Sequence, residues 1–145
     1  MKKTFYILTS TLLAASLIFS QGCGDKHTLS AQQVTSSQLE SGTWKIRTAT
    51  AANSVDVTSK FSGFTIKFSD KSFTTTNGGV IWSAIDTWIY KDAGAKSLIR
   101  GDGVPVTIES LTNEKLVLSF PWASTTYVGG RVNSISGSYQ FELVH

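Results

Sequence analysis

The sequence contains few of the residues on which enzymes usually depend. Histidine occurs only at His27 and at His145, the last residue, and cysteine occurs only at Cys23. Without imidazole in the body of the chain, Ser-His-Asp and Cys-His sites and most zinc sites are excluded. The motifs G-x-S-x-G, H-E-x-x-H, G-x-G-x-x-G and the P-loop are also missing. We therefore expect a protein that is not an enzyme and that needs no cofactor and no metal.

The composition also excludes several fold classes and one class of partner. A single cysteine and two prolines exclude a disulfide framework and collagen, and 11% aromatic residues exceed what disordered chains contain. A length of 145 residues suits one domain. Of the 13 basic residues, Lys2 and Lys3 stand at the very start, and the remaining 11 face 10 acidic residues, a balance of +1. We expect no nucleic-acid partner, because such partners need a basic surface.

Residues 1–22 have the pattern of an export signal. Two lysines follow Met1, and residues 5–19 form an uncharged, mostly apolar run. A helix of 15 residues is about 22 Å long, whereas the hydrocarbon core of a membrane is about 30 Å thick. The run therefore predicts a leader that is removed, in preference to a helix that spans the membrane.

The single cysteine follows this leader directly. The run Ser20-Gln21-Gly22-Cys23 resembles the lipobox of bacterial lipoproteins, in which the cysteine becomes the acylated first residue of the mature chain. The resemblance implies lipidation at Cys23 and a protein tethered to the cell envelope, with the outer membrane as the expected location. Simple secretion and an uncleaved anchor remain alternatives. The polar residues 23–38 predict a flexible tether, and residues 39–145 predict the folded domain.

From Gly42 onward, apolar and polar residues alternate with a period of two, which is typical of β-strands. The alternation is clearest in residues 64–69, 106–109, 116–120 and 139–143. Turn-forming residues separate these runs, as expected for antiparallel meanders. The pattern predicts an all-β fold of seven to nine short strands. A closed or nearly closed barrel is the preferred architecture, and a two-layer sandwich is the alternative.

Two segments of this β region carry a family resemblance. Gly42-Thr43-Trp44 resembles the G-x-W motif that opens the first strand of lipocalin-like domains in lipoproteins of the Bacteroidetes type. The run Ile108-Glu109-Ser110-Leu111-Thr112 and the Leu116-Val117-Leu118 that follows it resemble a hairpin common in that family. The resemblance implies a cup-shaped barrel that holds a small apolar molecule. It also implies that Trp44 closes the bottom of the barrel, and a core aromatic does so whether or not a ligand binds.

Large aromatic residues supply the candidate binding sites. Trp82, Trp88 and Tyr90 are candidates for lining a cavity, because an eight-stranded barrel is just wide enough for one small ligand; filling the core is their alternative role. Trp122 and Tyr127 lie in the Gly- and Ser-rich segment 121–130. There they either pack across the mouth of the barrel or face a ligand such as a sugar.

The acidic residues predict a solvated surface, with one exception. Asp92, Asp102 and Glu114 lie at turns, whereas Asp86 lies among apolar residues. If Asp86 turned inward it would need a basic partner such as Lys91, Lys96, Arg100 or Arg131. The sequence thus favours a lipid-anchored envelope barrel that binds a small apolar or amphipathic ligand. The alternative is a non-enzymatic structural or interaction module with a filled core, which contacts proteins or glycans through the Trp122 loop.

Overall fold

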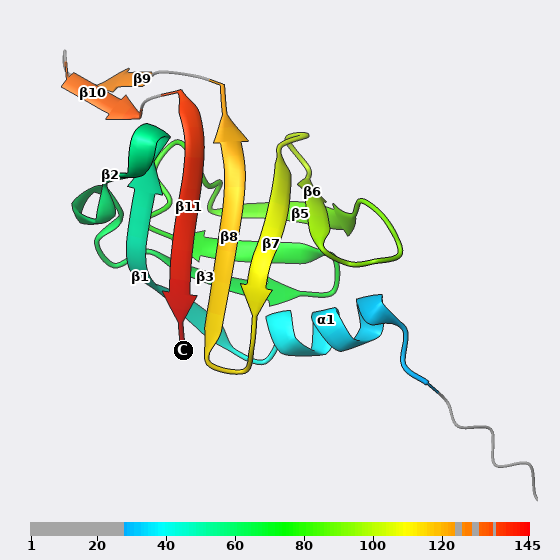
Figure 1. The fold of residues 1–145 in the computed structure, drawn as a ribbon. Helices are drawn as coiled ribbons and strands as arrows, with labels where there is room; N and C mark the ends of the chain where they lie inside the picture. The colour runs from blue at the N-terminus through cyan, green and yellow to red at the C-terminus, as the bar shows by residue number, and fades with distance from the viewer. Residues whose placement is uncertain (1–27, 124–125, 129–130, 135) are drawn as a thin grey trace, which may run out of the picture.

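A computed structural model describes residues 28–123, 126–128, 131–134 and 136–145 (Figure 1). It contains one α-helix, two short 3₁₀ helices and mainly β-strands. In chain order the elements are α1 (Ala31–Leu39), β1 (Thr43–Ala51), η1 (Ala52–Ser54), β2 (Val55–Asp56), η2 (Thr58–Phe61), β3 (Thr65–Ser69), β4 (Ser72–Thr76), β5 (Ile85–Tyr90), β6 (Ser97–Arg100), β7 (Pro105–Leu111), β8 (Lys115–Trp122), β9 (Thr126–Val128), β10 (Arg131–Ser134) and β11 (Gly137–Val144).

Eight antiparallel strands close into a barrel. Neighbouring strands follow the order β1-β3-β4-β5-β6-β7-β8-β11, and β11 pairs back onto β1, with Ile46 opposite Leu143. The short strand β2 adds to β1 outside this ring, and β9 and β10 form a separate hairpin between β8 and β11. The predicted all-β barrel is therefore confirmed, and the sandwich alternative is excluded because the ring of strands closes.

The alternation of the sequence becomes the inside and outside of this barrel. Ile66 and Phe68 of β3 are buried, whereas Lys67 between them is exposed. Phe68 lies opposite Phe73 of β4, across a turn in which Lys71 adopts a positive φ of 54°. Pro105 begins β7, where its missing N–H removes no ladder bond from the strand interior. Local patterning and turn residues thus agree with the closed sheet.

The helix α1 occupies the second half of the segment 23–38, which the sequence predicted to be a flexible tether. Its N-cap Ser30 accepts a hydrogen bond from the backbone of Gln33, and the Gln33 side chain accepts one from the Ser30 backbone, which completes a capping box. Only Leu39 of the helix is fully buried. The helix has few apolar residues of its own, so its contacts with the barrel hold it in place.

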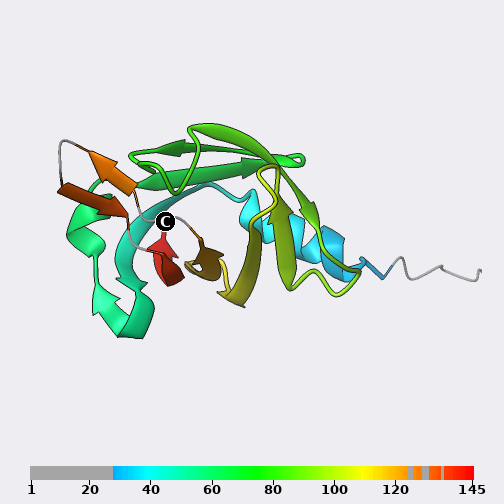
Figure 2. The ribbon, with the colours of Figure 1, turned by 90° about the horizontal axis from the view of Figure 1, so that it is seen from above.

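The barrel has two different ends, which the hairpin connections define. The α1 end carries the start of β1, the turns β3–β4, β5–β6 and β7–β8, and the chain terminus, with α1 lying across it (Figures 1 and 2). The loop end carries the connection of residues 77–84 between β4 and β5, the β6–β7 turn, and the segment that joins β8 to β11. These names are used below.

Candidate functional site

The interior of the barrel is packed with aromatic rings. Trp82, one of the predicted cavity-lining residues, is 2% exposed and lies at its centre. Its ring contacts four phenylalanine rings, with centroid distances from 5.2 to 6.4 Å: Phe64, Phe73, Phe120 and Phe141. Such edge-to-face and tilted arrangements are typical of a well-packed aromatic core. Trp82 therefore fills the space that a ligand inside the barrel would need.

Trp82 reaches the interior from a loop and not from a strand. The Asn77-Gly78-Gly79 turn is followed by Ile81 and Trp82, which are consecutive and both buried. A β-strand cannot bury two consecutive side chains on one face, so β5 begins only at Ile85. The loop folds back into the barrel, where the Trp82 backbone N–H donates to Gly78 O at 3.1 Å.

A buried cation accompanies this tryptophan. The side chain of Arg100 at the end of β6 is 2% exposed, and its guanidinium carbon lies 4.4 Å from the Trp82 ring centroid. Its Nη2 pairs with Asp102 at 2.5 Å. Burial lowers the pKa of Arg100, while the charges of Asp102 and Asp86 oppose that shift. Asp86 thus acts on Arg100 through its charge, although the ion pair itself is made by Asp102.

Three polar atoms of this pair have no hydrogen-bond partner among the residues that the structure describes. They are Arg100 Nε, Arg100 Nη1 and Trp82 Nε1, all buried among the described residues. A buried donor without an acceptor costs about 1–3 kcal/mol. The loop end of the barrel is thus tightly packed, but three of its buried donors make no hydrogen bond with the described residues.

The α1 end is closed by a second tryptophan. Trp44 is fully buried, and its Nε1 donates to the backbone oxygen of Leu39 at 2.8 Å. Its ring stacks on His145 at a centroid distance of 3.8 Å. Ser41 Oγ lies 3.0 Å from Nε2 of the same histidine. The last turn of α1, the start of β1 and the chain terminus are therefore joined around Trp44.

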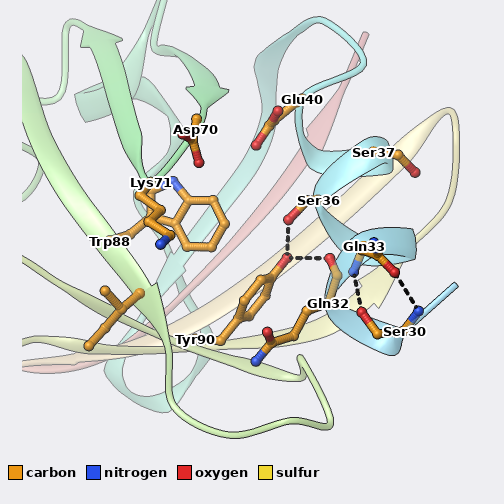
Figure 3. A pocket seen from close by; sticks show the side chains of 11 residues that line it. Ser30, Gln32, Gln33, Ser36, Ser37, Glu40, Asp70, Lys71, Trp88 and Tyr90 are labelled. Atoms are coloured by element: carbon orange, nitrogen blue, oxygen red, sulfur yellow. Dashed lines mark hydrogen bonds between the residues drawn. The ribbon is translucent and has the colours of Figure 1, made fainter.

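A groove of about 820 Å³ lies between α1 and the strands at this end (Figure 3). It is lined by residues of α1 and its flanks, of the β3–β4 turn, and of β5. These residues are Ser30, Gln32, Gln33, Ser36, Ser37, Glu40, Asp70, Lys71, Trp88, Ile89 and Tyr90. Two of the aromatic residues proposed from the sequence as ligand-contacting, Trp88 and Tyr90, thus meet at one concave surface.

The groove exists because β4 is shorter than β5. Their ladder ends at the pair Ser72 and Thr87, and the last bond toward this side is Trp88 N to Lys71 O at 2.9 Å. Beyond that point the neighbour of Tyr90 on this side is the helix α1 and not β4. Its hydroxyl lies 2.9 Å from Ser36 Oγ and donates to Gln32 O at 3.3 Å (Figure 3). The helix covers the gap without filling it.

The walls of the groove differ in chemistry. Trp88 is 3% exposed and belongs to the core, so it closes the groove from below. It is fixed by a bond from its Nε1 to Ser72 O at 3.0 Å and by an edge contact with Tyr90 at 5.0 Å. The Tyr90 hydroxyl is neutral and able to donate at neutral pH, and partial burial raises its pKa further above the ordinary value. Hydroxyl and amide side chains of α1 form the opposite wall, and Asp70, Lys71 and Glu40 stand at the rim. The arrangement suits a molecule with one apolar and one polar side.

The remaining predicted residues lie away from the groove. Trp122 ends β8, is half-buried and packs against the core from the loop end. Tyr127 belongs to β9, whose side chains lie outside the described part of the structure. Cys23 also lies outside the described residues. The sequence allowed a short helical turn over residues 30–39 but did not place it against β5, and the Ser30 to Gln33 capping pattern was the available signal for the helix.

Comparison with family models and with curated proteins finds no match to this chain. Within the described residues, no helix has the length and apolarity needed to cross a membrane. In the same part of the chain, His, Cys, Asp and Glu side chains do not gather into a group of three or more that would hold a metal ion. The geometry of the groove and the packing of the barrel therefore carry the functional inference.

Proposed function

We propose that this protein is a lipid-anchored, lipocalin-like barrel of the bacterial cell envelope that binds a small amphipathic molecule. The proposed binding site is the groove between α1 and β5. One observation carries the proposal: a concave space of about 820 Å³ has an aromatic floor and a polar wall built from different elements. Ligand sites in proteins are typically clefts of about 300–1,000 Å³ with a few polar groups that orient the ligand.

The packing of the barrel favours the groove over the interior. Trp82 and its phenylalanine neighbours fill the centre, so an interior ligand would have to displace a buried tryptophan. A ligand in the groove displaces only solvent. Its apolar part would lie near Tyr90 and the edge of Trp88, and its polar part would meet Ser37 and Lys71 at the rim. This role involves binding and no chemical step.

A dye-binding experiment tests the groove. Anilinonaphthalene sulfonate is an amphipathic probe whose fluorescence rises in apolar sites. The variant Ser37→Trp places a large ring on the groove wall, whereas Val34→Trp places the same ring on an exposed helix position outside the groove. We expect Ser37→Trp to weaken dye affinity by at least about tenfold, or about 1.4 kcal/mol. Val34→Trp should bind the dye as the unmodified protein does.

The same experiment distinguishes the alternative role. If both variants bind the dye equally well, the dye lies elsewhere and the groove is not the site. If none of the three proteins binds the dye or a panel of fatty acids and sterols, the interaction-module hypothesis is favoured. Circular dichroism and thermal melts of each variant ensure that a loss of binding does not reflect a loss of fold.

The proposed anchor needs a separate test. A mature chain that carries two or more acyl groups at Cys23 binds membranes stably, because each buried methylene contributes about 0.8 kcal/mol. In the variant Cys23→Ser we expect the protein to move from the membrane fraction to the soluble fraction. Retention of the variant on membranes would contradict lipidation as the means of attachment.

A further inference from the structure

The outer face of β5 exposes two isoleucines, Ile85 and Ile89, on either side of Thr87. Ile85 is 71% exposed and Ile89 is 57% exposed. Ile99 of β6 lies directly opposite Ile89 and is half-buried, which extends the apolar surface across two strands. By contrast, the outward positions of β3 carry threonine, lysine and serine. Exposed apolar surface of this kind commonly marks a contact with another molecule or with a membrane.

This face belongs to the side of the barrel from which the N-terminal segment emerges. The Gln32 side chain donates from Nε2 to Asp92 O in the β5–β6 turn at 3.0 Å. Tyr90, the last residue of β5, is bonded to Gln32 and Ser36 of α1. Figure 2 shows the first turn of α1 beside this turn. The start of the helix is thus fixed to the β5–β6 hairpin.

The length of the chain before α1 limits how far this side can be from an anchor at Cys23. Leu29 follows Cys23 by only six residues. A fully extended chain of six residues spans about 20 Å. Leu29 itself is 62% exposed. If Cys23 is acylated, the β5–β6 hairpin is therefore held within a short distance of the lipid surface, while the loop end can point away.

The charges around the hairpin are compatible with lipid headgroups. Lys91 and Lys96 flank the β5–β6 turn and are exposed. The carboxylate of Asp92 between them accepts a hydrogen bond from the Gly94 backbone at 2.8 Å, so it is held within the turn. These three side chains sum to a single positive charge. A lysine near an anionic membrane contributes about 1 kcal/mol to binding.

We infer that the outer β5–β6 face, formed by Ile85, Ile89 and Ile99, rests on the surface of the membrane in which the protein is anchored. This inference rests on the proposed acylation of Cys23. Because Ile89 also lines the groove, the groove then opens at the boundary between lipid and water. A ligand of this protein is therefore an amphiphile that enters from the lipid surface, and not a solute that enters from the aqueous phase.

Lysine acetylation of the vesicle-bound protein tests this orientation. The acylated protein is reconstituted in phosphatidylcholine vesicles that contain a minor share of phosphatidylglycerol, and it is treated with sulfosuccinimidyl acetate. Mass spectrometry then gives the rate at each lysine, relative to the Cys23→Ser protein in buffer. We expect protection of about fivefold or more at Lys91 and Lys96, which lie at the proposed interface. Lys45 on β1 and Lys115 on β8, both exposed, should react at unchanged rates.

A matched pair of double variants tests the role of the isoleucines. Ile85→Ser with Ile89→Ser removes the apolar face, whereas Val55→Ser with Val80→Ser removes two exposed apolar residues elsewhere, 55% and 43% exposed. The isoleucine variant should lose the protection of Lys91 and Lys96, and the valine variant should keep it. Protection that is equal in both variants, or equal reactivity of all four lysines in the unmodified protein, would overturn the inference.

Failure of the anchor is distinguishable from failure of the orientation. A protein that does not enter vesicles contradicts the proposed acylation. In that case sedimentation of the Cys23→Ser protein with excess vesicles still tests the face, because it compares the two double variants without an anchor. We expect the bound fraction to fall about threefold or more in the isoleucine variant alone, as the loss of buried apolar area requires. Equal bound fractions for both variants would overturn the inference independently of lipidation.

Discussion

The α1 end and the interior of the barrel each bury a tryptophan, but only one of the two indole nitrogens has a hydrogen-bond partner among the described residues. At the α1 end, Trp44 Nε1 donates to Leu39 O. Toward the loop end, Trp82 Nε1 and two donors of Arg100 have no partner among the described residues. Native interiors usually give buried polar atoms a hydrogen-bond partner. The surroundings of Trp44 follow this rule, whereas those of Trp82 depart from it. The groove lies at the completed end, where a rigid frame holds its walls in position.

The largest expected effect comes from removing the closure at the α1 end. Trp44→Ala should lower the free energy of unfolding by about 3–5 kcal/mol, because it removes a large buried ring and its bond to Leu39. Equilibrium urea denaturation measures this change. Trp82→Ala should cost about 1 kcal/mol less, since its indole nitrogen has no bond to lose. A larger cost for Trp82→Ala would break the comparison between the two ends.

A smaller effect should separate the two members of the buried ion pair. Asp102→Ala leaves the guanidinium buried without its carboxylate and should cost about 1–3 kcal/mol. Arg100→Met removes the charge together with its unpartnered donors, and we expect it to change stability by less than about 1 kcal/mol in either direction. Thermal and urea unfolding of both variants provide the measurement. Equal losses for the two variants would mean that Arg100 contributes to stability in its own right.

The smallest effect concerns the link between α1 and β5. Burial raises the folded-state pKa of Tyr90 above its ordinary value of 10.0, so the folded protein holds this proton more tightly than the unfolded chain does. Its contribution is complete below about pH 10 and is lost as the pH rises through the folded pKa. Tyr90→Phe should cost about 0.5–1.5 kcal/mol at neutral pH through the lost hydrogen bonds.

The pH dependence gives this prediction a control. The difference in urea midpoint between the unmodified protein and Tyr90→Phe should shrink above about pH 10, because only the unmodified protein carries the titrating hydroxyl. A difference that stays constant from neutral to alkaline pH would show that the hydroxyl does not stabilise the contact with α1.

The fold was more predictable from the sequence than the site. Alternation around Phe68 and the turn at Lys71 are local signals, and they determine the strands and their pairing. The position of Trp82 could not be predicted from its neighbours in the sequence. Burying Ile81 and Trp82 together requires a loop that returns into the barrel. The sequence allowed a helical turn where α1 lies, but its place against β5 was not predictable for a similar reason. Its polar face is held by Tyr90, nearly sixty residues along the chain, which no periodicity within the helix reveals.

The tryptophan side chains also provide a direct test of the proposed binding site. The four tryptophans report on four places: Trp44 on the α1 closure, Trp82 on the interior, Trp88 on the groove floor and Trp122 on the end of β8. Nuclear magnetic resonance resolves one indole N–H signal from each. Titration with anilinonaphthalene sulfonate should shift the Trp88 signal and the backbone amides of α1, and leave the Trp82 signal unchanged. A shift at Trp82 without a shift at Trp88 would contradict the groove as the binding site.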